Sequence, residues 1–116
     1  MLKPSYSLSM QAAIEHINAN LSASLSVEEI AKNSNISKNT LYRGFKKEFG
    51  MTVRDYITQK RMETAEKLLK NTDLSIEEIA DKVGFSTSAY FGSVFKKSKG
   101  ISPLKFRKEN TSPENG

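Results

Sequence analysis

The sequence contains no cysteine, and His16 is its only histidine among 116 residues. Without cysteine the chain can form neither a disulfide scaffold nor a thiolate metal site, and one histidine excludes a histidine-rich zinc site. A single histidine also argues against a Ser-His-Asp triad, and we expect His16 to be a structural residue. The composition therefore argues against redox and zinc chemistry, and we expect a protein that is not an enzyme and needs no metal or cofactor for binding.

Long hydrophobic runs are also missing. The first 30 residues lack the apolar core of a signal peptide, and no run approaches the ~18 apolar residues that span a bilayer. We therefore expect a cytoplasmic protein with no membrane partner. Eighteen Lys and Arg residues against thirteen Asp and Glu residues leave a net charge of +5, which favours a polyanionic partner such as nucleic acid.

An internal repeat organises the chain. Residues 26–31, Ser-Val-Glu-Glu-Ile-Ala, recur 49 positions later as Ser-Ile-Glu-Glu-Ile-Ala, and residues 45–50 recur 50 positions later with Phe-Lys-Lys and Gly in the same places. The offset changes by one residue between these segments, within 33–38 of the first copy and 82–88 of the second, which are rich in Ser, Asn and Gly as turns are. Each copy is therefore predicted to be a helix, a tight turn and a second helix.

Local signals mark where these helices begin. Residues 26–29 and 75–78 both fit the S-x-x-E capping box, which gives their glutamates a role in capping rather than in catalysis. In the first copy Ser37 can cap the second helix, and in the second copy either Ser86 or Thr87 can do so. The capping residues therefore predict two helical hairpins.

Other segments predict further helices outside the hairpins. These are a first helix from about Ser9, a long connecting helix over 52–70 that contains no Gly or Pro, and a last helix over 103–106. The last one follows Ser102, a capping residue placed directly before proline. The ends, 1–7 and 109–116, are expected to be irregular. No segment is typical of a strand, so we predict an all-α fold of about seven helices.

The second helix of the first copy has an unusual outward face. With Leu41 and Phe45 inside, a rotation of about 100° per residue brings four polar side chains to the opposite side. They are Asn39, Tyr42, Arg43 and Lys46. Asn can pair with adenine and Arg with guanine, Tyr can reach a phosphate or a thymine methyl, and Lys neutralises a phosphate. A face of this kind without an acid favours a DNA-binding helix-turn-helix over a packed helical hairpin or an ordinary solvated surface.

A long motif covers the second copy. It reads Ser75-Ile76-x-x-Ile79-Ala80-x-x-x-Gly84-Phe85-x-x-x-x-Tyr90-Phe91-x-x-x-Phe95-Lys96-Lys97-x-x-Gly100-x-Ser102-Pro103-x-x-x-Arg107. Upstream, the connecting helix carries Tyr56-Ile57-x-x-x-Arg61-x-x-x-Ala65-x-x-Leu68-Leu69. Both patterns resemble the DNA-binding domain of the AraC/XylS transcription regulators, and the resemblance extends from about Ser9 to Arg107.

The resemblance implies two helix-turn-helix subdomains, 8–50 and 72–109, joined by a linker helix over 52–71. Recognition helices over about 38–48 and 87–98 would enter successive major grooves on one face of double-stranded DNA. The base-reading positions carried over from the family are Asn39, Tyr42, Arg43, Ala89, Gly92 and Ser93. The family commonly has arginine where Ser93 stands, and Gly92 has no side chain, so the first copy is expected to read bases more sharply than the second.

Phosphate contacts are expected from cations and from helix N-termini near the recognition helices. The candidates are Ser37, Lys38, Lys46, Lys47, Arg61, Ser86, Thr87, Ser88, Lys96, Lys97 and Ser102. For Arg61 an ion pair with Asp55 or Glu66 is an equal alternative.

The sequence thus predicts a sequence-specific DNA-binding regulator of transcription that binds as a monomer. The alternative is a helical protein-interaction module that docks on RNA polymerase or another regulator. Many members of the family carry a separate sensing or dimerising domain. We therefore expect either a stand-alone regulator controlled by its amount or the C-terminal piece of a longer protein.

Overall fold

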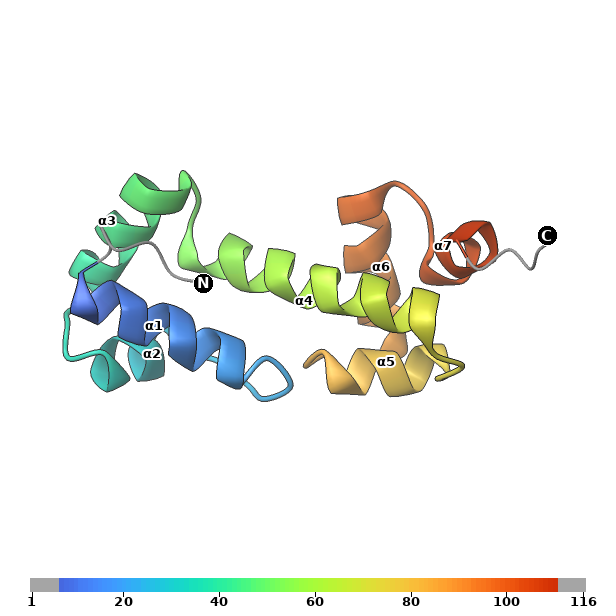
Figure 1. The fold of residues 1–116 in the computed structure, drawn as a ribbon, viewed down its shortest axis with the longest axis horizontal. Coiled ribbons are helices and arrows are strands. Elements are labelled where there is room, and N and C mark those ends of the chain that lie inside the picture. The colour runs from blue at the N-terminus through green and yellow to red at the C-terminus, as the bar shows by residue number, and fades with distance from the viewer. Residues whose placement is uncertain (1–6, 111–116) are drawn as a thin grey trace. The chain divides into compact units, whose positions relative to one another are not determined.

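Seven α-helices and no strand make up the regular structure of residues 7–110, the part of the chain that this computed structural model describes (Figure 1). They are α1 (Leu8–Ala19), α2 (Val27–Asn33), α3 (Lys38–Phe49), α4 (Val53–Asn71), α5 (Ile76–Lys82), α6 (Ser88–Lys99) and α7 (Pro103–Asn110). The all-α prediction is confirmed. The prediction of irregular ends is wrong for Ser7, which caps α1, and for Glu109 and Asn110, which lie in α7. The other end residues, 1–6 and 111–116, lie outside the described part.

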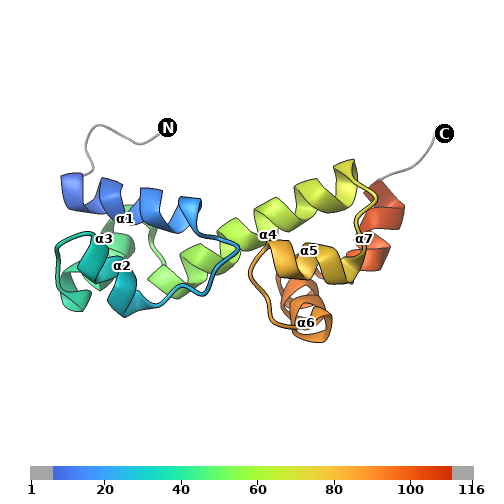
Figure 2. The same cartoon turned by 90° about the horizontal axis from the view of Figure 1, so that it is seen from below.

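The chain divides after Lys60 into two compact units. The first contains α1, α2, α3 and the beginning of α4, and the second contains the rest of α4 with α5, α6 and α7 (Figure 1). Within the first unit α2 packs on α1 and α3, and within the second α6 packs on α5 and α7 (Figure 2). Over residues 7–110 no helix combines the length and the apolar character needed to cross a membrane.

The core of the first unit takes one face from each of its helices. Its fully buried side chains include Ile17, Ile30, Leu41, Phe45 and Val53. The ring of Phe45 lies 5.1 Å from that of Tyr56 and 5.3 Å from that of Phe49, measured between centroids, so α3 is held against the first turns of α4. Because Leu41 and Phe45 point inward, the other side of α3 is left to solvent.

The second unit repeats this arrangement with different side chains. Its fully buried residues include Met62, Leu69, Ile79, Phe91 and Phe95. The ring of Phe106 meets that of Phe95 edge-on, with centroids 5.4 Å apart, which fastens α7 to α6. The last helix therefore continues to Asn110, four residues beyond the predicted end, because its apolar side packs on this core.

The turn of each hairpin contains one residue in the left-handed region. Asn35 has φ 61° and Gly84 has φ 90°, a conformation that favours Asn and Gly. In both turns the next N–H donates back to the first helix, from Ile36 to Ala31 at 3.1 Å and from Phe85 to Ala80 at 2.9 Å. The two turns are therefore equivalent up to this point, with a constant offset of 49.

The extra residue of the second copy is Ser86. Ser37 caps α3 by accepting from the N–H of Thr40, and Thr87, 50 positions later, caps α6 by accepting from the N–H of Tyr90. Of the two predicted caps Thr87 is therefore correct and Ser86 is wrong, because Ser86 lies in the turn, one residue before the N-cap and two before the first residue of the helix.

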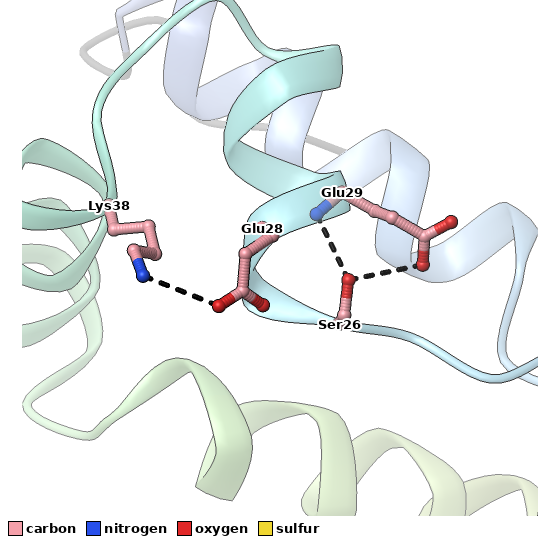
Figure 3. A network of polar contacts seen from close by, with 4 residues as sticks. All are labelled: Ser26, Glu28, Glu29 and Lys38. Carbon is pink, nitrogen blue, oxygen red and sulfur yellow. Dashed lines mark hydrogen bonds and ion pairs between the residues drawn. The ribbon is translucent and has the colours of Figure 1, made fainter.

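The capping boxes of the two copies differ. At α5 both halves are present, because Ser75 Oγ accepts from the N–H of Glu78 while the Glu78 carboxylate accepts from the N–H of Ser75. At α2 Ser26 Oγ accepts from the N–H of Glu29, but the Glu29 carboxylate accepts from the Ser26 hydroxyl instead (Figure 3). The predicted box is therefore complete only in the second copy.

Candidate nucleic-acid interface

The outward face of α3 is present as the sequence predicts. Asn39, Tyr42, Arg43 and Lys46 are all exposed, and 45% of the surface of Tyr42 is accessible although it is a large aromatic residue. On the same helix Leu41 and Phe45 are fully buried. Four side chains able to contact a DNA duplex therefore lie on one side of α3, and the opposite side of the helix is buried in the core.

Arg43 also borders an open depression on the first unit. The depression has a volume of about 480 Å³ and is lined by Ser7, Met10, Thr40, Arg43, Gly44, Lys47 and Glu48. It brings two of the predicted DNA-contacting residues, Arg43 and Lys47, to the same rim.

Lys38 is engaged with an acid of the neighbouring helix. Its ammonium lies 3.3 Å from the carboxylate of Glu28, and both side chains are more than half exposed (Figure 3). The pKa of Glu28 lies below its ordinary value, first because its own backbone N–H stabilises the carboxylate and then because Lys38 does. An exposed pair of this kind contributes little to stability, so Lys38 can exchange Glu28 for a phosphate at small cost.

The matching face of α6 is nearly bare. Ala89 and Ser93 are exposed, and Gly92, at the position equivalent to Tyr42, is half-buried with open space where a Cβ would stand. The Ser93 hydroxyl donates to the backbone carbonyl of Tyr90 at 3.1 Å. Because serine has only one O–H, this hydroxyl is left to act as an acceptor toward a ligand.

Tyr90 lies beside this face, although it is not among the site residues predicted from the sequence. It is 59% exposed, and its ring lies 5.4 Å from that of Phe85. The signal that could have found it is its position one helical turn before Ser93, which brings both to the same side of α6.

Arg61 is the first residue of the second unit. Its guanidinium sits over the ring of Phe85, 5.9 Å from the centroid, and burial lowers the pKa of Arg61 below its ordinary value. Of the two acids considered as partners, Glu66 forms an ion pair with Lys99 of α6. The phosphate contact of Arg61 stays a prediction.

The remaining candidates lie near the ends of the helices. Lys47, Lys96 and Lys97 are exposed on the last turns of α3 and α6, Ser88 is half-buried, and His16 is half-buried in α1. Ser102 caps α7 by accepting from the N–H of Lys105 at 3.1 Å.

Known proteins share this sequence pattern and this fold. A family model described as a helix-turn-helix domain matches residues 30–109. The Msm operon regulatory protein of Streptococcus mutans is 45% identical over 93 residues, which are 80% of this chain and 34% of that protein. The chain thus spans about a third of the length of that relative.

Two solved structures have the same fold over nearly the whole chain. The C-terminal domain of AraT, a response regulator from Geobacillus stearothermophilus, is 35% identical with a TM-score of 0.90, covering 97% of this chain and 93% of that one. A transcriptional regulator from Chromobacterium violaceum, described as containing an AraC-type DNA-binding domain, is 30% identical with a TM-score of 0.83, covering 90% and 94%. The chain therefore belongs to the AraC/XylS family of transcription regulators and contains the family's helix-turn-helix DNA-binding domain.

Proposed function

We propose that this chain binds double-stranded DNA at specific sequences and thereby regulates transcription, with α3 and α6 as its recognition helices. The exposed face of α3 carries the proposal, because Asn39, Tyr42, Arg43 and Lys46 are presented together while the other side of the helix is buried. Asn39 and Arg43 supply hydrogen bonds to base edges, and Tyr42 supplies an aromatic contact. In α6 the proposed base-facing residues are Ala89, Gly92 and Ser93.

The proposed phosphate contacts surround these two helices. They are Ser37, Lys38, Lys46, Lys47, Arg61, Ser86, Thr87, Ser88, Lys96, Lys97 and Ser102. The caps Ser37, Thr87 and Ser102 begin helices whose first N–H groups can face an anion, and the lysines and Arg61 supply charge. Ser86 does not cap a helix, so its proposed contribution is that of a polar side chain in the turn.

The proposed organisation follows the family. Residues 8–50 and 72–109 form the two helix-turn-helix subdomains, and residues 52–71 form the linker helix. The chain binds as a monomer, without a cofactor, and acts by binding rather than by catalysis. Because DNA is the proposed partner, the site of action is the cytoplasm, and RNA polymerase is the proposed protein partner in regulation.

A duplex titration tests the proposal. We expect tight binding to random duplex at low salt, with the logarithm of affinity falling linearly with the logarithm of salt concentration at a slope of about −0.9 per phosphate neutralised. Selection from a random pool should then yield one operator with a footprint of about two helical turns per single chain. A protein-interaction module predicts no binding to any duplex, so an absence of salt-sensitive binding would overturn the proposal.

A further inference from the structure

An exposed aromatic side chain of the second unit packs against a buried ring. Tyr90 is 59% exposed, yet its ring rests against Phe85 with centroids 5.4 Å apart and planes tilted by 57°. Phe85 is itself buried and packs on Phe91, with centroids 5.5 Å apart. The ring of Tyr90 is therefore anchored to the core, while among residues 7–110 its hydroxyl has no hydrogen-bond partner.

A cation lies beside this tyrosine. The guanidinium of Arg61, reaching from α4, lies 5.9 Å from the centroid of the same Phe85 ring. Burial lowers the pKa of Arg61, and Tyr90 lies close enough that its ionised form would raise it. The buried ring of Phe85 thus contacts both the positively charged Arg61 and the ring of Tyr90, which carries the hydroxyl. Arginine keeps its charge at any pH at which the protein is folded.

The position of Tyr90 on α6 indicates what this pair faces. At about 100° per residue, Tyr90 lies roughly 60° around the helix from Ser93 and roughly 20° from Lys97. It therefore flanks the face that would meet the bases. A helix inserted in the major groove turns its flanks toward the phosphates on the groove walls, and phosphate contacts fix the register of the protein on the duplex.

We propose that Tyr90 is a further DNA-contacting residue, whose hydroxyl donates a hydrogen bond to a backbone phosphate that the Arg61 guanidinium also binds. The proposal rests on the proposed function and adds a contact to the unit whose recognition helix has few side chains able to read bases. Guanidinium and phenol together offer several donors to one phosphate, and charge-assisted hydrogen bonds of this type are the stronger ones. This contact carries no base information, so it strengthens binding equally on all sequences.

The test is a double-mutant cycle on DNA affinity. Tyr90→Phe removes the hydroxyl but keeps the ring on Phe85, and we expect about a 3- to 10-fold loss of affinity with an unchanged salt slope. Arg61→Gln removes one charge, and the salt slope should become shallower by about 0.9. If both residues bind one phosphate, the double variant should lose less affinity than the product of the two single losses.

A matched control separates this contact from net charge. Lys67→Gln removes one charge from another exposed side of α4, because six residues at about 100° each separate it from Arg61 by roughly 120° around the helix. We expect its affinity and salt slope to stay close to those of the unmodified chain. Unchanged binding by Tyr90→Phe, or fully multiplicative losses in the double variant, would overturn the shared phosphate. If the unmodified chain itself binds no duplex, it is the proposed function that fails.

Discussion

The guanidinium of Arg107 donates a hydrogen bond from Nε to the backbone carbonyl of Leu69 over 3.1 Å. Its Nη2 donates to the carbonyl of Thr72, also at 3.1 Å. The last carbonyls of a helix have no partner within the helix, so α7 supplies the C-terminal cap of α4 through this one side chain. Arg107 is therefore a structural residue of the second unit, although it ends the motif that resembles the DNA-binding family.

Replacing this arginine should destabilise the second unit. We expect Arg107→Leu to lower the free energy of unfolding by about 1 to 3 kcal/mol, because partly buried carbonyls lose charged donors. Arg107→Lys should recover part of the loss, since an ammonium can reach one carbonyl but cannot donate as a fork. Urea denaturation measures both, with exposed Lys105→Gln on the same helix as the control. An unchanged midpoint for Arg107→Leu would show that the cap contributes nothing.

The repeat and the local signals were enough to predict most of the fold. Capping serines, apolar spacing and terminal glycines act within a few residues, so a sequence displays them directly. The outward face of α3 was predictable for the same reason, because Leu41 and Phe45 set the inward direction. Ser86 and Thr87 were both able to cap α6, and the spacing from the left-handed Gly84 and the buried Phe85 decided between them.

The features that the sequence could not show depend on contacts between different helices. Arg107 reaches carbonyls 38 and 35 positions away in the chain, and no periodicity within α7 or α4 indicates such a partner. Helical spacing places Tyr90 on the side of Ser93, but its packing on the ring of Phe85 becomes visible only in the structure. Arg61 likewise needed the position of Phe85 before its environment could be described.

The complete capping box of α5 should make stability depend on pH. The pKa of Glu78 lies below its ordinary value because the Ser75 backbone N–H, and then the Ser75 hydroxyl, hydrogen-bond its charged form. A lowered pKa in the folded state means that this contribution is present above about pH 4.3 and is lost as pH falls through the folded value. Glu78→Gln keeps a capping oxygen without the charge, so its stability should fall less steeply on acidification than that of the unmodified chain. Urea midpoints between pH 7 and pH 3 check this, and parallel curves would contradict it.

Two glycines inside helices should respond oppositely to the same substitution. A Cβ at Gly92 would meet nothing within 4 Å, so Gly92→Ala should stabilise the free protein by roughly 0.5 to 1 kcal/mol through helix propensity. At Gly44 a Cβ would lie 2.5 Å from Sδ of Met10, which is buried between α1 and α3. Gly44→Ala should therefore bring no gain, since the methionine must move. Thermal melting of both variants measures the difference. Equal stabilisation would mean that the Met10 side chain can move away from the new Cβ without loss of stability.

The two recognition helices should contribute unequally to sequence discrimination. Arg43 is exposed on α3 with a guanidinium that can pair with guanine through two hydrogen bonds, whereas Ser93 on α6 already donates its hydrogen to the Tyr90 carbonyl. Losing a paired arginine contact costs about 1 to 3 kcal/mol, so Arg43→Ala should abolish preference at one base position and leave non-specific binding largely intact. Ser93→Ala removes only an acceptor and should cost much less. A base-by-base substitution scan of a selected operator measures both variants. Equally sharp preferences in the two half-sites, or equal losses for the two variants, would refute the asymmetry, because the bare face of α6 would then be reading bases by some other means.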